Sequence, residues 1–224
     1  PDNLPTRHAL ADAYMEANLE NEGFATARST MQIAPTDIEN VLWYSNFMSE
    51  HNNARESIQV LKDTIHIRPD EKALYLTLAR TYVNLNQIEE TKETLNRMLE
   101  IEGIETEEYV NVANLYLHMN LTEEASEIIR KAISDNPTPD FQESRDLVYS
   151  VLKLGDAAAA LQLLKDLEPS LQNNPAYSLL KSDVLAANQQ FLPAIAALED
   201  ILTKTEFAPD MLGSVSGGDE GKIQ

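Results

Sequence analysis

Residues 106–139 read TEEYVNVANLYLHMNLTEEASEIIRKAISDNPTP, and this segment carries the clearest structural signal in the chain. In each half of it, large apolar residues recur three or four positions apart, which places them on one face of a helix. Asn120 stands between the halves, and asparagine tolerates the left-handed backbone conformation that closes a helix. Pro137 ends the second half, because proline cannot continue a helix. The segment therefore predicts two helices joined by a short turn.

The same pattern recurs along the chain with a period of 34 residues. The helix breakers that mark this period are Pro1, Pro35, Pro69, Gly103 and Pro137. The asparagines expected to end the first helix of each unit are Asn18, Asn52, Asn86 and Asn120. A column of small residues, which lets neighbouring helices approach closely, contains Ala11, Ser45, Ala79 and Ala113. Acidic pairs such as Glu123–Glu124 then fall in the first turn of the second helix, where they favour its dipole.

Several residues of this pattern coincide with those of a known repeat: Tyr109, Val112, Ala113, Tyr116, Ala125, Ile129, Ala132 and Pro137. The chain thus resembles the tetratricopeptide-repeat family, over roughly residues 4–202. The resemblance implies an all-α, right-handed superhelical solenoid of about six helix-turn-helix units. The units are expected at about 4–37, 38–71, 72–105, 106–139, 140–173 and 174–204.

Two units depart from the family pattern. In the first unit, Gly23 and Thr30 stand where the family prefers alanine. In the fifth unit the phase slips by one residue, and Pro169 is expected to end the second helix early.

The two ends of the chain differ in character from the repeats. Residues 1–3 are interpreted as the end of a preceding repeat, so the chain is expected to come from a longer array. Residues 205–224 include the flexible composition of residues 213–218, and predict a linker or a disordered tail. Phe207, Met211 and Leu212 are candidates to pack against the last helix.

Composition narrows the classes of function. The chain has 37 acidic and 17 basic residues, a formal net charge of −20, which disfavours binding to nucleic acids and to anionic membranes. Such a charge steers basic partners towards the protein, or serves solubility alone. No apolar run approaches the roughly 18 residues that a membrane span needs. A soluble protein of the cytoplasm or the bacterial periplasm is expected, with the compartment left open.

No motif for catalysis, metal binding or cofactor binding stands out. The chain has no cysteine, and its four histidines have no zinc-like spacing. Phosphate-binding glycine loops and a Gly-x-Ser-x-Gly motif are both missing from the sequence. The acidic residues around 100–108 have a simpler role at the start of the next helix. The chain is therefore predicted to be no enzyme and to need no cofactor or metal.

The family resemblance also implies where a partner would bind. In this family the first helices of the units line the concave side of the solenoid. The positions that face this side correspond here to Trp43, Asn46, Thr77, Arg80, Asn84, Asn111, Asn114 and His118. An asparagine side chain offers both a donor and an acceptor, so a row of asparagines suits the backbone of an extended peptide. Trp43 is either an exposed anchor for the partner or part of the packing between helices.

One specialised form of the family grips peptide carboxylates with basic residues. The matching positions here include His8, Asp12, Ala73 and Thr77, so the basic residues are missing except for Arg80. This form is therefore not favoured.

The leading hypothesis is a non-catalytic scaffold that binds a protein or an extended, possibly basic, peptide through the concave face of a longer repeat protein. The alternative is an accessory protein of the bacterial envelope, in which the acidic solenoid guides a cationic polymer such as a partly deacetylated polysaccharide during export. Self-association through the open ends of the array is a further possibility left open.

Overall fold

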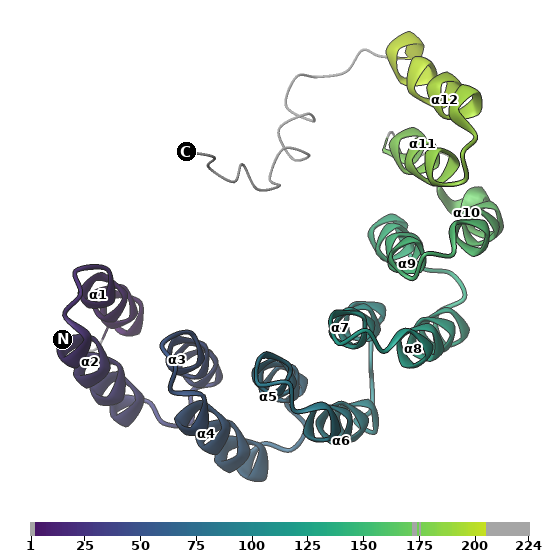
Figure 1. The fold of residues 1–224 in the computed structure, drawn as a ribbon. Coiled ribbons are helices and arrows are strands. Elements are labelled where there is room, and N and C mark those ends of the chain that lie inside the picture. The colour runs from purple at the N-terminus through teal and green to yellow at the C-terminus, as the bar shows by residue number, and fades with distance from the viewer. Residues whose placement is uncertain (1–2, 172–173, 175, 205–224) are drawn as a thin grey trace. The chain divides into compact units, whose positions relative to one another are not determined.

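The computed structural model describes residues 3–171, 174 and 176–204. This part of the chain forms twelve helices and no strand, and consecutive helices pair into six hairpins (Figure 1). The helices are α1 (Leu4–Glu16), α2 (Glu20–Ile33), α3 (Ile38–Glu50), α4 (Ala54–Ile67), α5 (Lys72–Asn84), α6 (Ile88–Leu99), α7 (Thr106–His118), α8 (Thr122–Asp135), α9 (Phe141–Lys153), α10 (Ala157–Leu171), α11 (Tyr177–Ala187) and α12 (Phe191–Lys204). The all-α repeat fold predicted from the sequence is confirmed.

Most residues at the two ends of the chain for which the sequence made predictions are not among those that the structure describes. Residues 1–2 and the predicted tail at 205–224, with Phe207, Met211 and Leu212, lie outside the described residues. Asn3 is described, and its side-chain oxygen accepts a hydrogen bond from the Thr6 backbone amide at the start of α1.

Each hairpin turns at one residue with a positive φ angle. Four of these residues are the predicted asparagines Asn18, Asn52, Asn86 and Asn120, with φ between 54° and 62°, and the other two are Gly155 and Gln189. At each of the four asparagine turns, the next residue donates its backbone amide to the carbonyl five positions earlier, as from Leu121 to Tyr116 at 2.9 Å. The step from Asn120 to Gly155 is one residue longer than the others, which confirms the predicted phase slip in the fifth unit.

Prolines end several second helices as predicted. Helices α2, α4 and α8 each stop two residues before Pro35, Pro69 and Pro137, respectively. Helix α6 stops at Leu99 and is followed by Gly103, which adopts a positive φ of 73°. Glycine takes this conformation without the steric cost that a side chain would add.

The prediction that Pro169 ends α10 early is wrong, because the helix continues through this residue to Leu171. Leu164, Leu167 and Leu171 lie three or four positions apart, and all three side chains are buried. Continuing the helix keeps Leu171 on the same buried face, and this burial offsets the backbone hydrogen bond that proline cannot make.

The helices form two compact units, one containing α1–α8 and the other α9–α12. Within the first unit, α3 packs against α5 and α5 against α7, while each even-numbered helix packs against the odd-numbered helix before it. The two sets form separate rows in Figure 1. The predicted small residues lie where the hairpins meet, since Ala11, Ser45, Ala79 and Ala113 are completely buried. This burial confirms the register deduced from the 34-residue period.

The unusual residues of the first hairpin have local explanations. A Cβ atom on Gly23 would lie 2.4 Å from the Met15 sulfur, so the methionine side chain fills the space that alanine occupies in the family pattern. Thr30 is buried, and its hydroxyl donates to the Thr26 carbonyl at 2.8 Å.

Candidate partner-binding surface

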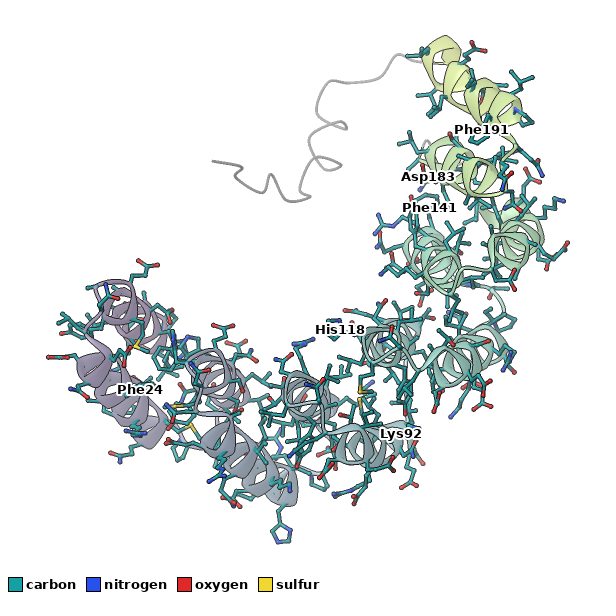
Figure 2. All side chains as sticks on the ribbon, viewed as in Figure 1. Phe24, Lys92, His118, Phe141, Asp183 and Phe191 are labelled. Atoms are coloured by element: carbon teal, nitrogen blue, oxygen red, sulfur yellow. The ribbon has the colours of Figure 1, made fainter. Side chains whose placement is uncertain are left out.

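The eight residues predicted to contact a partner all lie on α3, α5 and α7 of the first unit. Along each helix they are three or four positions apart and therefore share one face. Figure 2 shows His118 on the side of α7 turned away from α8, whereas Lys92 belongs to the opposite row. We call the face formed by Trp43, Asn46, Arg80, Asn84, Asn111, Asn114 and His118 the odd-helix surface.

These side chains differ in how much of them reaches solvent. Asn46, Arg80, Asn84 and His118 are exposed, and Trp43, Asn111 and Asn114 are half-buried. Thr77, the eighth predicted residue, is only 6% exposed and has little surface to offer a partner. It belongs to the packing of α5, where its carbonyl accepts a hydrogen bond from the Thr81 hydroxyl at 3.0 Å.

Trp43 is half-buried, and its ring packs against residues of two helices. Its ring stacks on His8 of α1, with 3.9 Å between ring centroids and 13° between the planes. His8 Nε2 lies 2.8 Å from the side-chain oxygen of the buried Asn40. The Asn40 amide group donates to the carbonyls of Thr30 and Ala34, so its oxygen is the atom left to accept from His8. This network holds the tryptophan ring in a defined orientation.

The aromatic contacts continue along α3 towards α2. Trp43 lies 5.2 Å from Phe47, and Phe47 lies 4.7 Å from His51, measured between ring centroids. Phe24 of α2 meets the edge of Phe47 at 6.0 Å. Sequence analysis missed this cluster, because its members come from three helices and no single segment shows them together. The one available signal was that His8 and Trp43 occupy adjacent positions in successive units.

On the even-numbered helices, ion pairs bridge neighbouring hairpins. Arg28 of α2 binds Glu56 of α4 at 2.8 Å, and the Tyr44 hydroxyl donates to the same carboxylate at 2.5 Å. The hydrogen bond from Arg28, with a smaller contribution from Tyr44, lowers the pKa of Glu56 below its usual value, although burial opposes the shift. Lys92 of α6 and Glu124 of α8 form a similar bridge at 2.6 Å.

An opening of about 320 Å³ is lined by residues of α4, α5 and α6. Lys62 and Glu90 follow Arg28 and Glu56 by one repeat, but they form no ion pair in the described structure. Instead, the Lys62 ammonium lies 5.7 Å from the centroid of the Tyr82 ring. Arg97 lies 5.8 Å from the centroid of the Tyr75 ring at the same opening. The sequence did not indicate this difference between successive bridges.

Among the described residues, no three histidine or acidic side chains gather closely enough to hold a metal ion. No helix in the same part of the chain has the length and apolar character of a membrane span.

A row of helical hairpins that meet through small residues defines a helical repeat scaffold. Profiles of the tetratricopeptide repeat match the chain over residues 48–103 and 109–139. Over these residues the chain contains repeats of the tetratricopeptide-repeat family. Proteins of this family generally act as non-catalytic scaffolds for protein interactions.

Several solved structures share this fold at low sequence identity. The chain is similar to PilW, a widely conserved type IV pilus biogenesis factor, with a TM-score of 0.54, 14% identity and coverage of 95% of this chain and 98% of that one. It is also similar to a tetratricopeptide repeat protein from Parabacteroides merdae, with a TM-score of 0.51, 12% identity and coverage of 96% and 83%. For pilF of Pseudomonas aeruginosa the TM-score is 0.50, at 10% identity and coverage of 96% and 97%. No curated protein sequence matches the chain significantly.

Proposed function

We propose that the chain is a non-catalytic scaffold that binds an extended segment of a partner protein along the odd-helix surface. The observation that carries this proposal is a face on the first helices of three consecutive hairpins, α3, α5 and α7, that presents amides, one guanidinium group and one oriented tryptophan. None of the seven residues that define this surface is acidic, although the chain as a whole carries a net charge of −20.

The chemistry of this face suits a peptide backbone. Asn46, Asn111 and Asn114 each carry a donor and an acceptor, which match the carbonyl and amide groups of an extended chain. Arg80 adds a cationic donor that binds carbonyls and carboxylates. Trp43 adds an apolar anchor whose stacking on His8 reduces the entropy lost on binding.

The test uses a peptide selected from a display library of short, unstructured sequences against the whole chain. We expect the double substitution Asn111→Ala with Asn114→Ala to weaken binding of this peptide about tenfold, because each lost hydrogen bond contributes about 0.5–1.5 kcal/mol. Trp43 is the only tryptophan, so its fluorescence reports binding directly.

The matched control is Asn96→Ala, which removes an exposed asparagine from α6 on the other row. This control should bind like the parent, and circular dichroism should show all variants equally helical. Unchanged affinity in the double variant, with folding intact, would contradict the proposal.

A second candidate function is the guidance of a cationic polymer by charge. The observation that favours it is the set of exposed acidic residues on the even-numbered helices: Glu89, Glu90, Glu93, Glu123 and Glu127. Binding of a partly deacetylated polysaccharide should then weaken steeply as salt is added, since screening acts on exposed charges. Binding at the odd-helix surface should depend much less on salt. A polymer affinity that does not change with ionic strength would rule out guidance by charge.

A further inference from the structure

Helix α12 exposes an apolar stripe that none of the roles above uses. The exposed fractions are 61% for Phe191, 80% for Leu192, 50% for Ile195, 41% for Leu198 and 78% for Leu202. The corresponding helix of the fourth hairpin begins instead with Thr122 and Glu123, followed by Glu124. Large apolar side chains gathered at solvent on one helix are typical of an interaction site. Figure 2 marks Phe191 at the start of this helix.

The spacing within the stripe specifies a mode of contact. Phe191, Ile195, Leu198 and Leu202 follow each other at intervals of four, three and four residues. This is the heptad spacing that forms the seam between two packed helices in a coiled coil. We call these four residues the α12 seam.

We propose that the α12 seam pairs with the same seam of a second copy of the chain, in antiparallel orientation. The intervals four, three and four read the same in both directions, so a two-fold axis brings each apolar residue opposite another. Phe191 then packs against Leu202 of the second copy, and Ile195 packs against Leu198. A patch that is complementary to itself is what a symmetric dimer interface requires.

The charge of the chain favours this surface over others for self-association. With a net charge of −20, two copies repel each other over most of their surfaces. The seam itself carries no charged residue, and Glu199 is the acidic residue beside it on the exposed side. Contact at α12 therefore combines the burial of apolar surface with little additional repulsion.

A different opening lies on another face of α12. It has a volume of about 550 Å³ and is lined by α11 and α12, including Tyr177, Lys181, Leu185 and Ala197. A helix of another protein, or residues 205–224 of this chain, would exclude the second copy if it bound the α12 seam. The experiment below separates these occupants.

The first test is sedimentation velocity of the full 224-residue chain between about 1 μM and about 100 μM. We expect the mass to change from monomer to dimer over this range. The substitutions Ile195→Glu and Leu202→Glu should each weaken the dimer at least about tenfold, because a charge would be buried in the seam. Leu202 is 78% exposed, so this second variant should fold even if Ile195→Glu does not.

The matched control is Leu10→Glu, which places the same charge at a leucine of α1 that is 45% exposed. It should dimerise like the parent. A full chain that stays monomeric at every concentration would overturn the proposal. A monomeric full chain whose truncation after Lys204 dimerises would also overturn it, and would assign the seam to residues 205–224.

Disulfide formation tests the relative orientation of the two α12 helices. The chain has no cysteine of its own, so only the introduced cysteines can form a disulfide. Antiparallel pairing predicts that a mixture of Ile195→Cys chains and Leu198→Cys chains forms the mixed disulfide in preference to either symmetric one. Preferential linkage of Ile195→Cys to itself would indicate parallel pairing and overturn the geometry proposed here.

Discussion

At the scale of single residues, the contact between hairpins is sensitive to one buried hydroxyl group. The small residue at this contact is alanine at positions 11, 79 and 113, and serine at position 45. Ser45 is completely buried, and its hydroxyl has no hydrogen-bond partner among the described residues. A buried polar group without a partner lowers stability by about 1–3 kcal/mol.

We therefore expect Ser45→Ala to raise the free energy of unfolding by about 1 kcal/mol, through removal of this group and through the higher helix propensity of alanine. Urea unfolding monitored by circular dichroism measures the change. Ser49→Ala is the matched control on the same helix, because the Ser49 hydroxyl lies 3.3 Å from the Thr81 hydroxyl and its loss should lower stability slightly. Equal effects of the two substitutions would contradict this account.

The bridge from Arg28 to Glu56 predicts a dependence of stability on pH. The arginine lowers the pKa of Glu56 in the folded state, so the unfolded state takes up the proton first as the pH falls. The bridge therefore stabilises the fold above the ordinary glutamate pKa of about 4.3 and loses this effect at lower pH. Glu56→Gln should cost at most about 1 kcal/mol at neutral pH, because the pair is partly exposed.

Denaturant unfolding of the parent and of Glu56→Gln at pH 7 and near pH 3.5 measures this dependence. The difference between the two proteins should shrink at the lower pH. A difference that grows with acidification would show that the carboxylate does not act through its ionised form.

At the scale of elements, the hairpin turn depends on one residue in the left-handed conformation. Asparagine or glycine occupies this position in five hairpins, whereas the sixth has Gln189 at a φ of 59°. Glutamine lacks the short side chain that lets asparagine bond to its own backbone there, and unlike glycine it carries the steric cost of a Cβ atom. The turn between α11 and α12 is therefore strained relative to the others.

We expect Gln189→Gly to raise the free energy of unfolding by about 0.5–1 kcal/mol, because glycine adopts this conformation without steric cost. The measurement is thermal and urea unfolding of both proteins. Asn120→Gly, at the equivalent turn between α7 and α8, should change stability by only a few tenths of a kcal/mol. A loss of stability in Gln189→Gly would mean that the glutamine side chain makes a contact that offsets the strain.

At the scale of the whole molecule, the net charge of −20 acts on every association. It draws cationic partners towards the chain and keeps two copies apart, and salt screens both effects. The Debye length falls from about 30 Å at 0.01 M to about 3 Å at 1 M ionic strength. Salt should therefore separate association by charge from association by apolar burial.

We expect the proposed α12 dimer to become several-fold tighter when ionic strength rises from about 0.02 M to about 0.5 M, because repulsion between the copies is screened. Sedimentation velocity at the two salt concentrations measures this change. Binding of a cationic polymer to the same sample should change in the opposite direction. A dimer that dissociates at high salt would show that ion pairs, and not the apolar seam, hold it together.

The repeat, the helices and their turns were predictable because each depends on residues close together in the chain. Asn86 closes a helix and Pro69 prevents one from continuing whatever lies beside them in space. The burial of Ala79 and Ala113 followed from the same period, since a recurring small residue implies a recurring close contact.

Other features depended on contacts between distant segments and only the tertiary structure settled them. Lys62 lies over the Tyr82 ring and forms no ion pair with Glu90 in the described part of the chain, although its equivalent Arg28 pairs with Glu56. Trp43 owes its orientation to His8, and α10 continues past Pro169 because Leu171 is buried. Local backbone preferences set the period and the turns, whereas the choice among competing long-range contacts is made only when the helices pack together.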